Sequence, residues 1–251
     1  MTDEPYRTLA GVYEWLVAQP LLTPEGSVAA FTEVVDRLDA GARVLDCAAG
    51  IGQLAVGLAM RGFDVVASDA GGAMIERTRA LAAHHGVDLP TAVCTWEHLT
   101  DQGWSSSFDA VFCVGNALTH APGQSARRAA LAQMAATLRP GGVLVLTSRN
   151  WELVRNAGSG LQIAEQLVER HGKRGLVVRT WTIADHWDHE HHLDTAVVFL
   201  DTDGRVTSHT ERLAFWPFRH ETLDEDLRAA GLSPATTTYT DDVDRYRVTA
   251  T

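Results

Sequence analysis

Short apolar runs alternate with segments of helical periodicity between residues 43 and 147, and this alternation restricts the fold more than any other feature. The apolar runs span residues 43–48, 64–69, 91–96, 108–114 and 143–147. Between them, apolar residues recur every three or four positions, as Leu54 and Leu58 do. The fourth run is almost continuously apolar, as strands covered on both faces are. The sequence therefore predicts an α/β fold with a parallel, doubly wound, Rossmann-like sheet.

The pattern changes after residue 150. Residues 151–175 are expected to be helical, and a final helix is expected to start at Thr222, with Glu225 completing a capping box. Between these helices lie three strand-like runs with no helix separating them, at residues 176–184, 193–200 and 206–215. Two short strand-like pieces, 236–239 and 246–249, end the chain. An additional antiparallel element of three strands is therefore predicted beside the parallel sheet.

The net charge of the chain disfavours two classes of partner, and its apolar runs and cysteines indicate where the protein is located. Lysine and arginine number 21, and aspartate and glutamate number 32, so the formal net charge is −11. Such a chain has no long-range attraction for nucleic acid or anionic lipid. No apolar run reaches the ~18 residues of a membrane span, and the acidic N-terminus lacks a secretory pattern. Cys47, Cys94 and Cys113 lie in apolar runs and are expected to be free thiols. These features predict a cytoplasmic protein without a nucleic-acid or membrane partner.

A glycine-containing loop follows the first predicted strand. Gly50 and Gly52 would let the backbone turn tightly and approach a ligand closely, at the start of a helix. Asp69 ends the second predicted strand, where a carboxylate can accept hydrogen bonds from both ribose hydroxyls. The spacing from Gly50 through Gly52 to Ala55 also satisfies a loose NAD fingerprint. The loop alone therefore leaves the nucleotide undecided.

Three features favour S-adenosylmethionine (SAM) over a dinucleotide. Asp46 precedes the loop, where a carboxylate would repel a pyrophosphate but suits the amino and sulfonium groups of SAM. Thr95 and Trp96 end the third predicted strand, where adenine could stack beside the indole. Finally, residues 139–142, Arg-Pro-Gly-Gly, resemble the segment that class I SAM-dependent methyltransferases place before the fifth strand. The cofactor expected is SAM, with S-adenosylhomocysteine as its product.

Two longer stretches resemble the glycine N-methyltransferase and glycine/sarcosine N-methyltransferase group. They are residues 108–120, FDAVFCVGNALTH, and residues 139–150, RPGGVLVLTSRN. The resemblance implies that the Gly115 carbonyl and the Asn116 side chain face a substrate amine, and that Arg149 pairs with a substrate carboxylate. It also implies that His120 lies near the methionine part of SAM and that the segment around Tyr13 covers the site. The strands after residue 175 resemble the sheet that roofs the substrate pocket in this group.

These considerations give a set of expected site residues. Those expected to act on the substrate are Asn116, Arg149, His120 and Tyr13. Those expected to contact the cofactor are Asp46, Ala48, Gly50, Gly52, Asp69, Ala70, Met74, Thr95, Trp96, Val114, Gly115 and His120. A single domain is expected over residues 1–251. Its parts are an N-terminal helical lid (1–40), a SAM-binding core (41–150), a helix with roof strands (151–216) and a C-terminal helix with strands completing the sheet (217–251).

Methyl transfer to an amine requires few functional groups from the protein. The transfer is an in-line displacement at a sulfonium, and an unprotonated amine is already a sufficient nucleophile. The protein must orient the amine and exclude water, and the sulfonium charge itself lowers the amine's pKa. A small-molecule amine is therefore the acceptor favoured here. An oxygen or carbon acceptor needs a base, for which His120 or a histidine of residues 186–192 is available.

Two further classes of function remain open from the sequence. One is methylation of tRNA or protein, which the acidic composition disfavours. The other is a SAM-binding module without catalysis. The group that the chain resembles includes oligomers, so a homo-oligomer is a further expectation.

A histidine-rich run, residues 185–192, combines four histidines with three carboxylates. Alternate positions of a strand would face one way, which suggests a metal site, but the spacing matches no closed zinc pattern. A pH-sensitive or substrate-facing role is a second alternative. Because the run separates two strand-like segments, a solvated turn is predicted, and no metal is expected.

Overall fold

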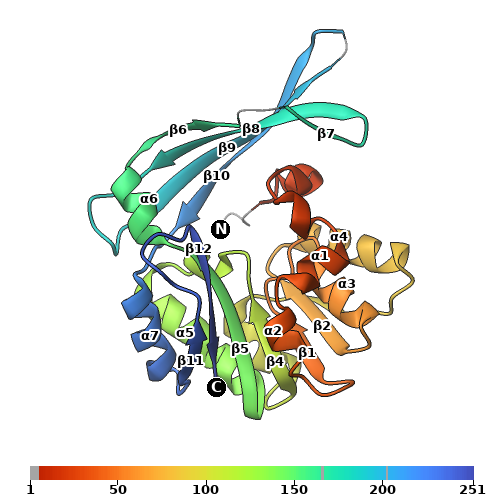
Figure 1. Ribbon diagram of the computed structural model, residues 1–251, viewed down its shortest axis with the longest axis vertical. Helices are drawn as coiled ribbons and strands as arrows, with labels where there is room; N and C mark the ends of the chain where they lie inside the picture. Colours follow the sequence, from red (N-terminus) through yellow and green to blue (C-terminus); the bar gives the residue numbers. More distant parts are fainter. Residues whose placement is uncertain (1–5, 165–166, 202) are drawn as a thin grey trace.

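The computed structural model describes residues 6–164, 167–201 and 203–251 and contains two β-sheets (Figure 1). The first has seven strands in the order β11-β12-β5-β4-β1-β2-β3. Strands β1 to β5 run parallel to one another, whereas β12 is antiparallel to β5 and to β11. This confirms the predicted α/β fold. The strands are β1 (Arg43–Asp46), β2 (Asp64–Asp69), β3 (Thr91–Val93), β4 (Phe108–Cys113), β5 (Leu138–Arg149), β11 (Pro234–Thr237) and β12 (Arg245–Ala250).

Helices cover both faces of this sheet because its strands direct apolar side chains to both sides. On β4, Val111 packs with α5 and α7, while Ala110 and Phe112 pack with α1, α2 and α3. This two-sided burial explains the near-continuous apolar character of the strand. The helices are α1 (Pro24–Ala29), α2 (Thr32–Val35), α3 (Gln53–Met60), α4 (Gly72–His84), α5 (Gly123–Thr137), α6 (Trp151–Ala157) and α7 (His220–Ala229). Short 3-10 helices are η1 (Ala10–Trp15), η2 (Gln19–Leu21), η3 (Trp96–His98), η4 (Thr100–Gln102) and η5 (Ala117–His120).

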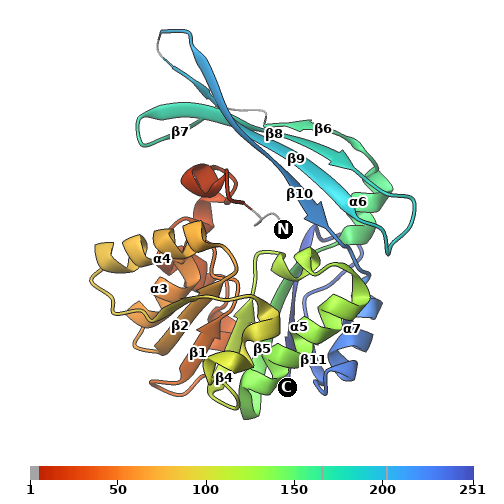
Figure 2. The ribbon, with the colours of Figure 1, turned by 180° about the vertical axis from the view of Figure 1, so that it is seen from behind.

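The second sheet is antiparallel and arches over one end of the α/β layer, as the two opposite views show (Figures 1 and 2). Three long strands form it, β8 (Lys173–Thr182), β9 (His191–Leu200) and β10 (Val206–Phe215). These confirm the predicted antiparallel element. Two shorter strands, β6 (Gly160–Ile163) and β7 (Val168–Arg170), both pair with β8.

The helix predicted over residues 151–175 is wrong beyond its first two turns for the described residues of this range, and residues 165 and 166 lie outside them. Helix α6 ends at Ala157, and Gly158 follows with a φ of +73°. Leu161 and Ile163, which supported the helical interpretation, lie on edge strand β6 and are exposed. Pairing with β8 gives this segment its hydrogen bonds, so tertiary contacts override the local apolar spacing.

Apolar residues recur at helical spacing between residues 28 and 38, but Phe31 leaves the helical conformation and separates α1 from α2. Two other local predictions need correction. The capping box at Thr222 is also wrong, since α7 starts at His220 with Arg219 as its N-cap. In addition, Trp96 lies in η3, beyond the end of β3.

The N-terminal segment around η1 (Ala10–Trp15) lies between the α/β layer and the second sheet (Figures 1 and 2). Trp15 packs edge-on against Phe199 of β9 at a ring separation of 5.0 Å. Glu14 pairs with Arg77 of α4 at 3.0 Å, and Arg170 of β7 donates to its carbonyl oxygen. The segment is therefore attached both to the α/β layer and to the second sheet. In the described part of the chain, no helix has the length and hydropathy that crossing a membrane requires.

Candidate active site

A cavity of about 670 Å³ lies where loops after β1, β2, β3 and β4 meet the N-terminal segment and β12. This volume is within the range of small-molecule sites. Most of the predicted site residues line it: Tyr13, Asp46, Ala48, Gly50, Asp69, Ala70, Met74, Thr95, Trp96, Val114, Gly115 and His120. The parallel sheet explains this gathering, because the carboxyl ends of parallel strands share one edge.

Asp69 organises the loop end of the cavity. Its two carboxylate oxygens accept hydrogen bonds from the backbone N–H groups of Gly50 and Gly71, each at 2.8 Å. An ionised carboxylate has about four acceptor positions, so these two bonds leave capacity for ligand hydroxyls. The side chain is thus held at a fixed place on the cavity wall.

The two glycines of the loop have different surroundings. A Cβ on Gly50 would meet only the Tyr13 ring, at 4.0 Å, so this residue keeps the cavity open. A Cβ on Gly52 would lie 2.8 Å from the Thr78 side chain, and Gly52 has a φ of +87° and does not line the cavity. The N–H of Gly52 donates to the Ala49 carbonyl. Gly52 therefore serves the packing of α3 on α4, and its predicted cofactor contact stays a prediction.

Asp46 is a buried carboxyl group on the cavity wall, 1% exposed. Burial raises its pKa to about 7, and the negative charge of Asp69 adds to this effect. The N–H of Ala48, 3.4 Å away, opposes the rise only in part. The site thus contains an acidic group whose ionised form lacks a cationic partner among the described residues.

Replacing Asp46 with asparagine is expected to stabilise the ligand-free protein in a pH-dependent manner. The folded protein keeps a proton on Asp46 up to about pH 7, whereas the unfolded chain releases it near pH 4. The contribution of Asp46 to stability therefore falls as pH rises between these values. Asp46→Asn should raise the free energy of unfolding by roughly 1–4 kcal/mol at pH 8 and by less at pH 5, measured by urea unfolding. A gain that is equal at both pH values would contradict this.

Trp96 forms another part of the cavity wall. Its indole N–H donates to the Cys47 carbonyl at 2.9 Å, which fixes the ring at the end of β1. A flat ring held at the cavity wall offers a face for a planar ligand group.

His120 is held neutral at the other side of the cavity. Its Nδ1 lies 2.8 Å from the Ala214 carbonyl, which only accepts, so Nδ1 carries the proton. Nε2 is left as acceptor for the Tyr6 hydroxyl at 3.3 Å. Burial lowers the pKa of His120 to about 4, although the bond to Ala214 opposes the shift. His120 is therefore a weak base at neutral pH.

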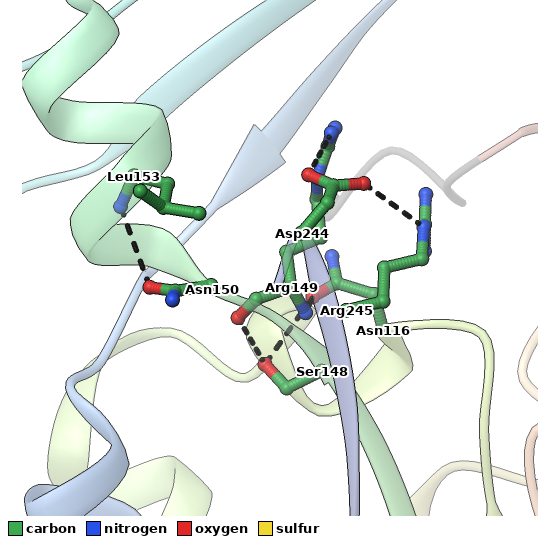
Figure 3. Close-up of polar contacts among 7 residues, drawn as sticks. All are labelled: Asn116, Ser148, Arg149, Asn150, Leu153, Asp244 and Arg245. Carbon is green, nitrogen blue, oxygen red and sulfur yellow. Dashed lines mark hydrogen bonds and ion pairs between the residues drawn. The ribbon is translucent and has the colours of Figure 1, made fainter. Parts of the chain in front are cut away.

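Asn116 and Arg149 do not line the cavity. Asn116 has a φ of +67°, which Asn tolerates better than most residues, and its side chain bridges Thr119 and the Arg149 N–H at 2.9 Å each. The Arg149 guanidinium pairs with Asp244 at 2.9 Å (Figure 3). Both side chains have partners within the chain, and their predicted contacts with a substrate stay predictions.

Sequence reasoning missed Tyr6 and Arg245, which both line the cavity. Tyr6 packs edge-on against Tyr13 at 5.2 Å and bonds His120. Arg245 starts β12, which lies beside β5 only after the C-terminal segment has folded back. No local motif marks either residue, although the aromatic residues near the N-terminus were a weak signal for Tyr6.

The histidine-rich run lies apart from the cavity. His191 is buried in β9, and its Nε2 lies 2.7 Å from the Arg155 guanidinium, while Arg155 also donates to the carbonyls of Ala184 and Asp185. The prediction of a solvated turn is therefore wrong for the end of the run, which belongs to the second sheet. Among the residues that the structure describes, no group of three or more metal-ligand side chains is placed to hold an ion.

Comparison with known proteins agrees with this geometry. Residues 44–142 match the family model described as a methyltransferase domain. The core of this chain is thus similar to that family. The match runs from Val44 in β1 to Gly142 in β5 and includes the ends of β1 and β2, with Asp46 and Asp69, and the loop with Gly50.

Relatives extend the likeness beyond the domain. Glycine/sarcosine N-methyltransferase of Parasynechococcus marenigrum is 37% identical over 123 residues, which cover 49% of this chain and 43% of the relative. The chain therefore matches less than half the length of that relative. Among solved structures, the CcbJ methyltransferase of Streptomyces caelestis has a TM-score of 0.79 at 21% identity, over 100% of this chain and 98% of that one. CalS10, an amino pentose methyltransferase of Micromonospora echinaspora solved with SAM, has a TM-score of 0.72 at 23% identity, over 100% and 98%. These structures share the fold.

Proposed function

We propose that this protein is a SAM-dependent methyltransferase that acts on the amine nitrogen of a small molecule. The observation that carries the proposal is the pair of carboxyl groups, Asp46 and Asp69, placed with Gly50 on the cavity wall of a methyltransferase domain. SAM, when bound, supplies a methyl group on a positively charged sulfur. Asp69 is positioned to accept from ribose hydroxyls, and Asp46 to pair with the methionine ammonium.

The cavity suits SAM better than a dinucleotide. A pyrophosphate needs free backbone N–H groups at the glycine loop, but those of Gly50 and Gly52 already donate to Asp69 and Ala49. Two carboxyl groups beside the loop would repel the phosphates. The same charges attract the positive end of SAM, and its ammonium would favour ionised Asp46.

The protonation of His120 supports an amine acceptor over an oxygen or carbon one. A hydroxyl needs a base, and His120, the histidine that lines the cavity, has a pKa lowered to about 4. An amine needs orientation and exclusion of water, which the N-terminal segment with Tyr6 and Tyr13 provides over the cavity. The relatives named glycine/sarcosine N-methyltransferase also act on nitrogen. A cytoplasmic location and a homo-oligomer remain predictions.

Two measurements test the proposal. Calorimetry should show binding of SAM and S-adenosylhomocysteine, with no binding of NAD at the same concentrations. Incubation with methyl-labelled SAM and a panel of amines, amino acids and phenols should then transfer label to an amine. Preferential binding of NAD would contradict the cofactor assignment. Transfer to a phenol alone would contradict the amine acceptor.

A further inference from the structure

Arg155 of α6 holds the connection between β8 and β9, residues 183–190, against the helix, and the two lie together in both views (Figures 1 and 2). Its Nη1 donates to the Ala184 carbonyl and its Nη2 to the Asp185 carbonyl, each at 2.8 Å. The guanidinium also lies 4.6 Å from the centre of the Trp187 ring, within the range of a cation–π contact. One side chain therefore supplies three contacts to the β8–β9 connection.

His191, the first residue of β9, makes a further contact with Arg155 and is 0% exposed. Its Nε2 lies 2.7 Å from Nη1 of Arg155, and its Nδ1 lies 3.1 Å from the His189 carbonyl. A guanidinium only donates and a carbonyl only accepts, so Nε2 is unprotonated and Nδ1 carries the hydrogen. Both contacts thus require the neutral form of the ring.

The elements packed around His191 bring mainly aromatic rings to it. Helix α6 contributes the buried Trp151 ring, whose centre is 6.3 Å from that of His191, in addition to Arg155. On β10, Phe215 is the direct partner of His191. From β8, Trp181 packs against the Trp151 and Phe215 rings. A proton on His191 would therefore place a charge in an apolar environment beside a cation, which costs free energy.

The charges around the ring act in the same direction. Burial lowers the pKa of His191, and the charges of Arg155, His192 and His189 lower it further, while the bond to the His189 carbonyl opposes the shift. Among the described residues, no carboxylate pairs with His191. Other charged groups near the connection include Asp185 and Asp188, which are exposed, Glu190, which pairs with His192 at 3.3 Å, and Arg219, 5.1 Å from the Trp187 ring.

We propose that His191 and Arg155 form a pH-sensitive latch that holds the β8–β9 connection on α6 and opens when His191 is protonated. The proton would turn the acceptor Nε2 into a donor 2.7 Å from a guanidinium N–H, so attraction is replaced by repulsion. When Arg155 withdraws, the carbonyls of Ala184 and Asp185 and the Trp187 ring lose their shared partner. The open form binds the proton more tightly, because its histidine is solvated. The ratio of open to closed protein should therefore rise by about tenfold for each pH unit below the ordinary pKa of histidine, until the closed form is also protonated.

The latch lies where the second sheet joins the α/β layer. The Trp151 ring next to His191 is also 5.5 Å from Phe215, and the Phe215 ring is 4.5 Å from that of His120 on the cavity wall. The carbonyl of Ala214, which precedes Phe215, lies 2.8 Å from Nδ1 of His120. Opening the latch is therefore expected to loosen the packing behind His120. This inference does not depend on the proposed methyl acceptor.

Fluorine NMR of protein labelled with fluorotryptophan tests the latch. Trp187→Phe assigns the Trp187 signal among those of the seven tryptophans. From about pH 8 to about pH 5, the wild-type Trp187 signal should move and its solvent isotope shift should grow, as the ring becomes exposed. In His191→Gln, whose amide oxygen can accept from Arg155 at every pH, the signal should keep its closed position. His209→Gln removes an exposed histidine of β10 and is the control, which should titrate as wild type.

Arg155→Gln gives an independent measurement if His191→Gln does not fold. Without the guanidinium, the Trp187 signal should have the open position at both ends of the pH range. Three results would each overturn the latch. They are a wild-type signal that stays closed down to about pH 5, a signal that moves equally in His191→Gln, and a closed signal at about pH 8 in Arg155→Gln.

Discussion

Replacing Asp69 with alanine is expected to weaken SAM binding by about 100-fold or more. The substitution removes the charged group that we propose accepts from two ribose hydroxyls, and hydrogen bonds to charged groups are worth about 1.5–3 kcal/mol each. It also releases the N–H groups of Gly50 and Gly71, which the carboxylate holds in place. Calorimetric titration with SAM measures the loss directly.

Asp64→Ala provides the matched control for this prediction. Asp64 starts the same strand, β2, but its side chain is 62% exposed and pairs with Arg43 at the surface. The control should change the dissociation constant of SAM less than twofold. An Asp69→Ala protein that melts cooperatively and still binds SAM within threefold of wild type would remove Asp69 from the cofactor site.

Asp226→Ala is expected to cost about 3–5 kcal/mol in the free energy of unfolding, because it leaves a buried charge without its partner. Asp226 of α7 is 0% exposed and accepts from the guanidiniums of Arg127 and Arg128 on α5, each at 2.6 Å. Gln124 donates to the same carboxylate at 3.1 Å. Arg127 is itself only 3% exposed, so its charge would stay buried. Urea unfolding monitored by circular dichroism measures the change.

Glu225→Ala is the control for Asp226→Ala on the neighbouring position of α7. Glu225 is exposed, and its removal should change the free energy of unfolding by less than about 0.5 kcal/mol. Asp226→Asn, which keeps one acceptor oxygen, should fall between the control and the alanine variant. A loss below 1 kcal/mol in Asp226→Ala would show that α5 and α7 are held together by their apolar contacts alone.

Most of the glycine-loop end of the cavity could be predicted because its residues follow a local rule. Asp46, Gly50 and Asp69 each lie at or just after the end of a parallel strand, and such ends share one edge of a sheet. Trp96 was placed on the cavity wall for the same reason, although it belongs to η3 and not to β3. A correct order of strands was enough to place these residues at one edge of the sheet. Errors of a few residues in the strand bounds did not change this prediction.

The residues expected to contact the substrate followed no such rule. The family resemblance pointed to Asn116 and Arg149. The Asn116 side chain instead bonds Thr119 and the Arg149 N–H, and the Arg149 guanidinium pairs with Asp244, 95 positions further along the chain. Residues 160–163 and 168–170 illustrate the same point. The apolar spacing of this part of the sequence resembles a helix, but β8 supplies these residues with a hydrogen-bonding partner in the folded chain.

The sequence by itself determined the parallel sheet and the acidic, glycine-lined end of its cavity, because strand periodicity and strand-end motifs are encoded by neighbouring residues. Only the tertiary structure decided which groups meet away from these strand ends. Arg149 and Arg245 become direct partners when β12 returns beside β5, and His191 meets Arg155 when β9 packs beside α6. The raised pKa of Asp46 is also a tertiary property, since burial and the charge of Asp69 exist only after folding. Long-range contacts of this kind depend on chain topology, which no local pattern specifies.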